Sequence, residues 1–155
     1  MNALLPIGFD RDRQHEVVTE SLRSQLIGWA RDALPDECCG VLLGREATSA
    51  GIPEIRIAYP LTNTAAEPRR SFAFDAAELA QVTRLHRGEL DVVGFFHSHP
   101  SSPPAPSRSD IDHASAWPGY LQIIIGQGGA GFEVCCFLVG EHDWHQLEQR
   151  SDSHG

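Results

Sequence analysis

The sequence predicts an α/β sandwich in which a mixed β-sheet is flanked by helices. Segments with helical apolar spacing and helix-start signals alternate with short apolar runs that are typical of strands. The run at 90–96, LDVVGFF, is almost wholly apolar, which favours a central strand covered on both faces. The length of 155 residues suits one domain. We therefore expect a single domain over 1–155, with a core over about 16–148 and flexible ends at 1–15 and 149–155.

Two helices are expected over 19–35 and 75–88. In the first, apolar residues recur at helical spacing, and Thr19 is the candidate N-cap. In the second, Asp75 and Glu78 have the spacing of a capping box. Each segment therefore carries both a periodic apolar face and a start signal.

Four further runs are predicted to be strands, at 38–44, 54–61, 120–126 and 132–139. The first two are expected to pair as a hairpin. The Gly-rich segment 127–131 lies between two strands and not before a helix, so we interpret it as a turn rather than a phosphate-binding loop. Residues 71–74, SFAF, are a candidate for one more short strand.

Composition narrows the class of protein. The chain is 41% hydrophobic and 21% charged, as in ordinary soluble globular proteins. Its formal net charge is -9 and it has no run of basic residues, which argues against nucleic acid or an anionic membrane as the main partner. No apolar run approaches the length of a membrane span, and the first residues lack the basic start of a secretory signal. A cytoplasmic location is expected.

The four cysteines form two adjacent pairs, Cys38-Cys39 and Cys135-Cys136. Neighbouring residues on a strand point to opposite faces, so neither pair can chelate one metal as C-x-x-C would. We interpret them as small buried apolar residues. A cross-strand disulfide is geometrically open but is not expected in a cytosolic chain.

The segment 94–110, GFFHSHPSSPPAPSRSD, carries the residues with the clearest chemistry. His97 and His99 are one residue apart at the end of an apolar strand, so their side chains project to the same side. Ser107 and Asp110 have the S-x-x-D spacing of a helix start, after a loop long enough to fold back. Two imidazoles and a carboxylate, with one position left for water, are the composition of a catalytic zinc site.

A zinc hydrolase also needs a base that accepts the proton of the attacking water. Glu37 directly precedes the predicted strand 38–44, and His97 ends another strand. If the two strands are neighbours, the carboxylate could lie over the metal. The alternatives are that Glu37 is a solvated charge at a strand edge, and that the histidines are merely polar residues where a strand emerges.

Two segments resemble a known family. HSHPSSPPAPSRSD matches without a gap the pattern of the JAMM (MPN-plus) metalloproteases: H-x-H, seven residues, S, two residues, D. DECCGVLLG resembles the upstream E-x-C-G-x-L-x-G segment that supplies the catalytic glutamate of that family. Residues 59–79 and 117–125 resemble the small bacterial branch often called Mec-plus. The resemblance covers about residues 16–140 and implies the MPN fold, a cytidine-deaminase-like three-layer sandwich with a mixed central sheet.

The resemblance also implies site roles. His97, His99 and Asp110 would bind one Zn²⁺ per chain, with a water as fourth ligand. Glu37 would act as general base and then as general acid toward the departing amine. Ser107 would hydrogen-bond the polarised carbonyl or the developing oxyanion, a role compatible with a plain N-cap. The implied activity is a zinc metalloprotease that hydrolyses the amide bond after the C-terminal Gly-Gly of a ubiquitin-like or sulfur-carrier protein.

Several alternatives stay open. A non-catalytic MPN scaffold would bind partners only, and a JAMM peptidase could instead act on cell-wall or phage-tail substrates. A zinc deaminase would need H-x-E with P-C-x-x-C, which is absent. An Fe(II) oxygenase also uses two histidines and a carboxylate, but it has no need for Glu37 or Ser107. The oligomeric state is open, a homodimer included.

Overall fold

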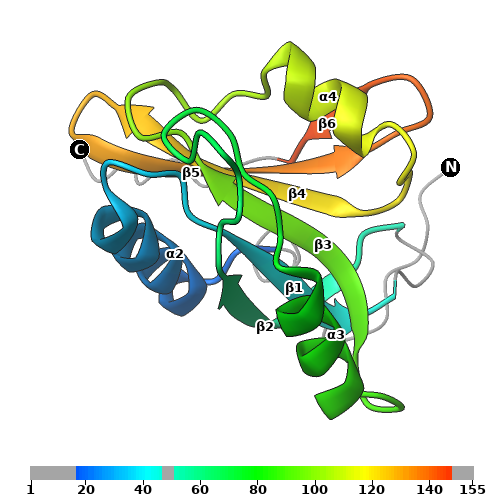
Figure 1. Cartoon of the computed structure of the whole chain (residues 1–155). Helices are drawn as coiled ribbons and strands as arrows, with labels where there is room; N and C mark the ends of the chain where they lie inside the picture. Colours follow the sequence, from blue (N-terminus) through cyan, green and yellow to red (C-terminus); the bar gives the residue numbers. More distant parts are fainter. Residues whose placement is uncertain (1–16, 47–50, 148–155) are drawn as a thin grey trace, which may run out of the picture.

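The computed structural model describes residues 17–46 and 51–147. Within them lie three helices and one six-stranded sheet (Figure 1). The helices are α2 (Glu20–Ala33), α3 (Ala76–Leu85) and α4 (Arg108–Ala114). The strands are β1 (Cys39–Arg45), β2 (Glu54–Leu61), β3 (Asp91–Ser98), β4 (Leu121–Gly128), β5 (Gly131–Val139) and β6 (Trp144–Gln146). None of the helices in these two ranges has the length and apolar character needed to cross a membrane.

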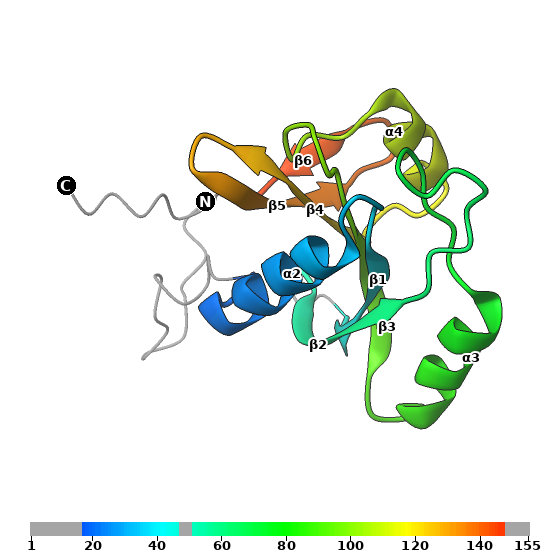
Figure 2. The same cartoon turned by 60° about the vertical axis from the view of Figure 1, so that its left-hand side comes forward.

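The sheet is mixed, as predicted. Its strand order is β2-β1-β3-β4-β5-β6, and only β3 and β4 pair in parallel. The helices α2 and α3 lie on opposite sides of the part of the sheet formed by β1 and β3 (Figure 2). This arrangement confirms the predicted three-layer α/β sandwich.

Helix α2 covers one face of the sheet. The Oγ1 atom of Thr19 accepts a hydrogen bond from the Leu22 N–H at 3.2 Å, which confirms the predicted N-cap. Trp29 stacks on Phe96 of β3, with ring centroids 5.6 Å apart. The buried residues of the helix recur every four positions: Leu22, Leu26 and Ala30. They join the larger apolar core with β1, β3, β4 and β5.

Helix α3 begins at the predicted place but without the predicted capping box. Asp75 caps it, because its Oδ1 accepts from the N–H groups of Ala77 and Glu78. The Glu78 carboxylate instead accepts from the N–H of Thr62 at 2.7 Å and from the Thr62 hydroxyl at 3.0 Å. The first turn of α3 is therefore tied to the chain that leaves β2.

The segment 71–74 is not a strand, contrary to the prediction. Within the described residues, its only ladder contact is an isolated bridge between Phe74 and Asn63. Its backbone bonds to the chain just after β2: the Ala73 N–H donates to the Asn63 side chain, and the Ala73 carbonyl accepts from the Thr64 N–H. The apolar residues that suggested a strand instead place aromatic rings on β3, since Phe74 stacks on Phe95 at 5.0 Å.

The other four predicted runs are strands, and β1 pairs with β2 as the expected hairpin. All four cysteines are free. Burial raises the pKa of the Cys39 and Cys136 thiols to about 12, so both stay protonated and behave as small apolar residues. The expected flexible ends at 1–15 and 149–155 lie outside the described residues.

The pairing of β1 with β3 also gives a test of the fold. A Cβ at Gly40 would overlap the Tyr59 carbonyl oxygen and the Phe96 ring. We expect Gly40→Ala to lower the free energy of unfolding by about 1–3 kcal/mol. The control is Gly28→Ala in α2, where nothing lies within 4 Å of the added carbon and helix propensity predicts a gain of about 0.8–1 kcal/mol. Urea unfolding measures both, and equal midpoints for Gly40→Ala and wild type would contradict this packing.

Candidate active site

Two histidines from β3 and one aspartate from α4 converge. His97 Nε2 lies 3.2 Å from His99 Nε2 and 3.3 Å from Asp110 Oδ1. His99 Nε2 lies 3.2 Å from Asp110 Oδ2. Both histidines are buried, and the Asp110 side chain is 10% exposed. The structure thus brings together the three residues that the sequence proposed as metal ligands.

The spacing of these donor atoms fits one metal ion. Two ligand atoms at about 2.0–2.1 Å from a tetrahedral metal lie about 3.4 Å apart. The two imidazole Nε2 atoms are 3.2 Å apart, one Asp110 oxygen lies 3.3 Å from His97 Nε2, and the other lies 3.2 Å from His99 Nε2. Two imidazole nitrogens and a carboxylate oxygen are also the donor set of catalytic zinc centres. His97, His99 and Asp110 could therefore hold a divalent metal ion in common.

A hydrogen bond holds one ring nitrogen of His99. Nδ1 lies 2.9 Å from the carbonyl oxygen of Pro103, which can only accept, so Nδ1 carries the hydrogen. Nε2 faces the other two donors; burial lowers the pKa of His99, but its hydrogen bond to Asp110 raises it on balance, so Nε2 gives up a proton when a metal binds. The His99 backbone N–H donates to the Ile125 carbonyl of β4 at 2.7 Å, so ring and backbone are both fixed.

The Pro-rich loop after His99 is held along β4. Gln127 donates from its backbone N–H to the Ser102 carbonyl at 2.8 Å and from its side chain to the Pro100 carbonyl at 2.9 Å. The backbone of residues 103–104 lies so close to Gly126 that a side chain there would overlap it. These contacts fix the path of the loop that returns the chain from His99 to α4.

His97 is the most enclosed of the three. Phe72 covers its ring, with centroids 4.4 Å apart and planes at 22°. Burial lowers the pKa of His97 despite its hydrogen bond to Asp110, which favours the neutral imidazole that binds metals. Its Nδ1 has no hydrogen-bond partner within the described part of the chain.

Asp110 is held by the start of α4. The Ser107 hydroxyl oxygen accepts from the Asp110 N–H at 3.1 Å, and the Asp110 carboxylate accepts from the Ser107 N–H at 2.8 Å. This closes the predicted capping box. Burial raises the pKa of Asp110, but hydrogen bonds from His97 and His99 outweigh it and the net shift is downward. The carboxylate is therefore ionised, and Ser107 has its hydroxyl hydrogen left to donate.

Glu37 lies at the same place because β1 pairs with β3. Cys39 is directly opposite His97 in the ladder, which confirms that the two strands are neighbours. The Glu37 side chain belongs to a residue only 7% exposed, and its Oε2 has no partner among residues 17–46 and 51–147. Burial raises its pKa to about 7, with His99 lowering it and Asp110 raising it. A carboxyl group with that pKa is suited to take up and release a proton near neutrality.

Ser98, between the two histidines, carries no signal in the sequence but has a structural role. Its hydroxyl oxygen accepts from the Cys38 N–H at 2.8 Å, and its own N–H donates to the Cys38 carbonyl at 3.0 Å. The residue between the two histidines thus holds the residue next to Glu37. The sequence could not predict this contact, because it depends on the register of β1 against β3.

The ligand assignment predicts the effect of a conservative change. Asp110→Asn keeps the shape of the side chain but removes its charge, and we expect Zn²⁺ affinity to fall by more than about 100-fold, since losing even a supporting partner of a ligand costs about 10–100-fold. Asp112→Asn, on the exposed side of the same helix, should bind as wild type does. Competition with a chromophoric chelator measures both, and equal affinities for wild type and Asp110→Asn would rule out this site.

The sequence and the fold are both similar to those of known proteins. A family profile described as prokaryotic homologs of the JAB domain matches residues 19–137. The desampylase of Haloferax volcanii is 37% identical over 112 residues, covering 69% of this chain and 77% of that protein. The CysO-cysteine peptidase of Mycobacterium tuberculosis is 34% identical over 100 residues, covering 64% of this chain and 65% of that protein.

Solved structures agree with the sequence matches. The solution structure of a protein from Desulfitobacterium hafniense has a TM-score of 0.66 at 27% identity and covers 84% of this chain and 91% of its own. A JAB1/MPN domain protein from Archaeoglobus fulgidus shares the fold alone, with a TM-score of 0.51 at 19% identity over 81% of this chain and 88% of its own. The profile spans most of the chain and includes every residue of the candidate site, so this chain belongs to the prokaryotic branch of the JAB (JAMM/MPN) domain family.

Proposed function

We propose that the chain is a zinc-dependent peptidase that hydrolyses the amide bond after the C-terminal Gly-Gly of a ubiquitin-like carrier protein. One observation carries the proposal: Glu37 is buried, its Oε2 has no hydrogen-bond partner among the described residues, and it lies near enough to His99 and Asp110 for their charges to shift its pKa. A non-catalytic scaffold has no use for that carboxyl group, whereas a hydrolase needs a base at this position.

The relatives support the class of reaction and of substrate. Their names, desampylase and CysO-cysteine peptidase, describe the removal of groups joined to small proteins, and nothing in them favours a cell-wall or phage-tail substrate. Because the match to the CysO-cysteine peptidase spans just under two thirds of that protein, its substrate is carried over here as a proposal only. The four free cysteines support a cytoplasmic location, where thiols stay reduced.

His97, His99 and Asp110 would hold the zinc ion through the atoms that face one another. Bound there, Zn²⁺ supplies a Lewis acid and lowers the pKa of a water molecule to near neutrality. The neutral His97 and the ionised Asp110 are already in the protonation state that a ligand needs, whereas the raised pKa of His99 means that its Nε2 releases a proton when the metal binds.

The remaining steps belong to Glu37 and Ser107. Glu37 accepts a proton from the attacking water, whose oxygen forms the new bond to the carbonyl carbon. It then donates that proton to the departing nitrogen as the C–N bond breaks, so the products are the carrier's Gly-Gly carboxylate and a free amine. Ser107 donates its hydroxyl hydrogen to the carbonyl oxygen as negative charge develops on it.

The role of Glu37 can be separated from metal binding. Glu37→Gln removes the base but none of the ligands, so we expect cleavage to fall by at least about 100-fold while the zinc content stays at the wild-type level. The assay incubates the zinc-loaded protein with a carrier extended beyond Gly-Gly and reads the intact mass. Glu89→Gln, an exposed glutamate in the turn after α3, is the matched control.

Two results would count against the proposal. Cleavage by Glu37→Gln at the wild-type rate would remove Glu37 from the mechanism. Failure of the wild type to cleave any ubiquitin-like or sulfur-carrier fusion would remove the substrate class.

A further inference from the structure

We propose that Asn63 is a positioning residue: it fixes the backbone of Glu37 and thereby the place of the base relative to the metal ligands. The inference rests on the proposed function, because that function makes Glu37 the base. It goes beyond that function, because Asn63 forms no hydrogen bond with a metal ligand within the described residues and acts through Glu37.

The backbone of Glu37 is held by a loop and not by the sheet. β1 begins at Cys39, so Glu37 lies before the first pair of the ladder. Its N–H donates to the Pro68 carbonyl at 2.7 Å, and its carbonyl accepts from the Asn63 side chain at 3.0 Å. Both partners belong to the connecting loop, residues 62–75 between β2 and α3. The place of Glu37 therefore depends on the path of this loop.

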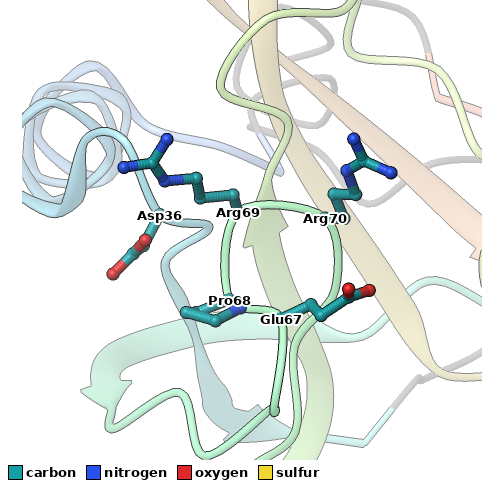
Figure 3. Close-up of a pocket in the computed structure, with 5 residues that line it drawn as sticks. All are labelled: Asp36, Glu67, Pro68, Arg69 and Arg70. Carbon is teal, nitrogen blue, oxygen red and sulfur yellow. The ribbon is translucent and has the colours of Figure 1, made fainter.

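The middle of the connecting loop lies beside the chain that leads into Glu37 (Figure 3). A turn is closed here by a hydrogen bond at 3.0 Å from the Arg70 N–H to the Glu67 carbonyl, and it holds the Pro68 carbonyl toward the Glu37 N–H. The two segments line one depression in the surface, through Asp36, Glu67, Pro68, Arg69 and Arg70.

The side-chain amide of Asn63 uses all of its hydrogen-bonding capacity here. Its nitrogen donates to the carbonyls of Glu37 and Ser71, both at 3.0 Å. Its oxygen accepts from the N–H groups of Ala65 at 3.0 Å and Ala73 at 3.1 Å. An amide has two N–H donors and two acceptor lone pairs, so these four bonds satisfy it and fix its orientation. Asn63 therefore joins the two ends of the connecting loop to the backbone of the base.

The same bonds hold the far end of the loop against a metal ligand. Ser71 and Ala73, which flank Phe72, both bond to the Asn63 side chain. The Phe72 ring stacks on the His97 ring, with centroids 4.4 Å apart. One side chain thus connects the base to the segment that covers a metal ligand, so this part of the site is ordered before a substrate arrives.

Asn63→Ala tests the proposal, because it removes these bonds and leaves Glu37 and the metal ligands in the chain. We expect kcat for a ubiquitin-like carrier extended beyond Gly-Gly to fall about 10- to 100-fold, the effect of misplacing a catalytic group by about 1 Å. KM and the zinc affinity should stay at the wild-type level. The control is Thr64→Ala, which removes a hydrogen bond at 3.2 Å to the Ala73 carbonyl in the same loop but none to Glu37, and should cleave as wild type does.

A double-mutant cycle separates action through Glu37 from a general loss of structure. In Glu37→Gln the base is already absent, so adding Asn63→Ala should lower the remaining rate by less than about twofold. A merely structural role would lower the rate by the same factor in both backgrounds. Asn63→Asp keeps the shape and the acceptor oxygen but sets an oxygen against the Glu37 carbonyl, and it gives the same test if Asn63→Ala does not fold.

Hydrogen exchange of the metal-free protein gives a measurement that needs no activity. We expect the Glu37 N–H to exchange about 10- to 100-fold faster in Asn63→Ala than in wild type, the effect of losing the bonds that hold its partner in place. Thr64→Ala should leave this exchange rate unchanged.

The outcomes separate the two proposals. Wild-type kcat in Asn63→Ala, an equal loss in both backgrounds of the cycle, or unchanged exchange of the Glu37 N–H would each overturn the positioning role and leave the peptidase function standing. Failure of the wild type to cleave any ubiquitin-like or sulfur-carrier fusion would overturn the peptidase function, and the role of Asn63 with it, because no base would remain to be positioned.

Discussion

The antiparallel pairing of β1 with β3 is the constraint on which the site depends. It places the start of β1 against the end of β3, so that Cys39 lies opposite His97. The two hydrogen bonds between Cys38 and Ser98 fix this end of the ladder. As a result, a glutamate sixty residues upstream of the histidines in the chain lies beside them in the fold. A shift of register by one residue would turn the histidines to the opposite face.

Two polar atoms of the site are buried without hydrogen-bond partners among the described residues, and a third, Trp144 Nε1, lies outside the site on β6. Glu37 Oε2 and His97 Nδ1 both lack a hydrogen bond within the described residues, and each such atom costs a fold about 1–3 kcal/mol. The polar side chains around them, Asn63, His99 and Ser107, all have hydrogen-bond partners. For Glu37 Oε2, we interpret the missing partner as the place of the water whose proton the carboxylate takes up.

Much of the ligand set could be predicted from the sequence because its signals are local. The spacing of His97 and His99 fixes which way they project, and S-x-x-D fixes a helix start that carries Asp110. The position of Glu37 is not local: it follows from the neighbouring order of two strands, which the family resemblance suggested and the ladder confirms. The MPN fold was likewise expected from the resemblance and is confirmed by the relatives.

What could not be predicted depends on tertiary contacts. The expected capping box does not form, because the Glu78 carboxylate accepts hydrogen bonds from the N–H and the hydroxyl of Thr62 instead. Residues 71–74 do not form the expected strand, because their backbone hydrogen-bonds to the Asn63 side chain and their aromatic rings stack on residues of β3. Both departures fall on the chain between β2 and the first turn of α3, where tertiary contacts override the local signals.

We propose that one bound metal ion and the Glu37 carboxylate face each other across a single water molecule. A crystal structure of the zinc-loaded protein, with anomalous data at the zinc edge, tests it directly. The account predicts zinc at about 2.0–2.2 Å from His97, His99 and Asp110, with a Glu37 carboxylate oxygen about 2.6–3.2 Å from the water in the fourth position. Zinc bound elsewhere, or Glu37 turned away from that water, would contradict it.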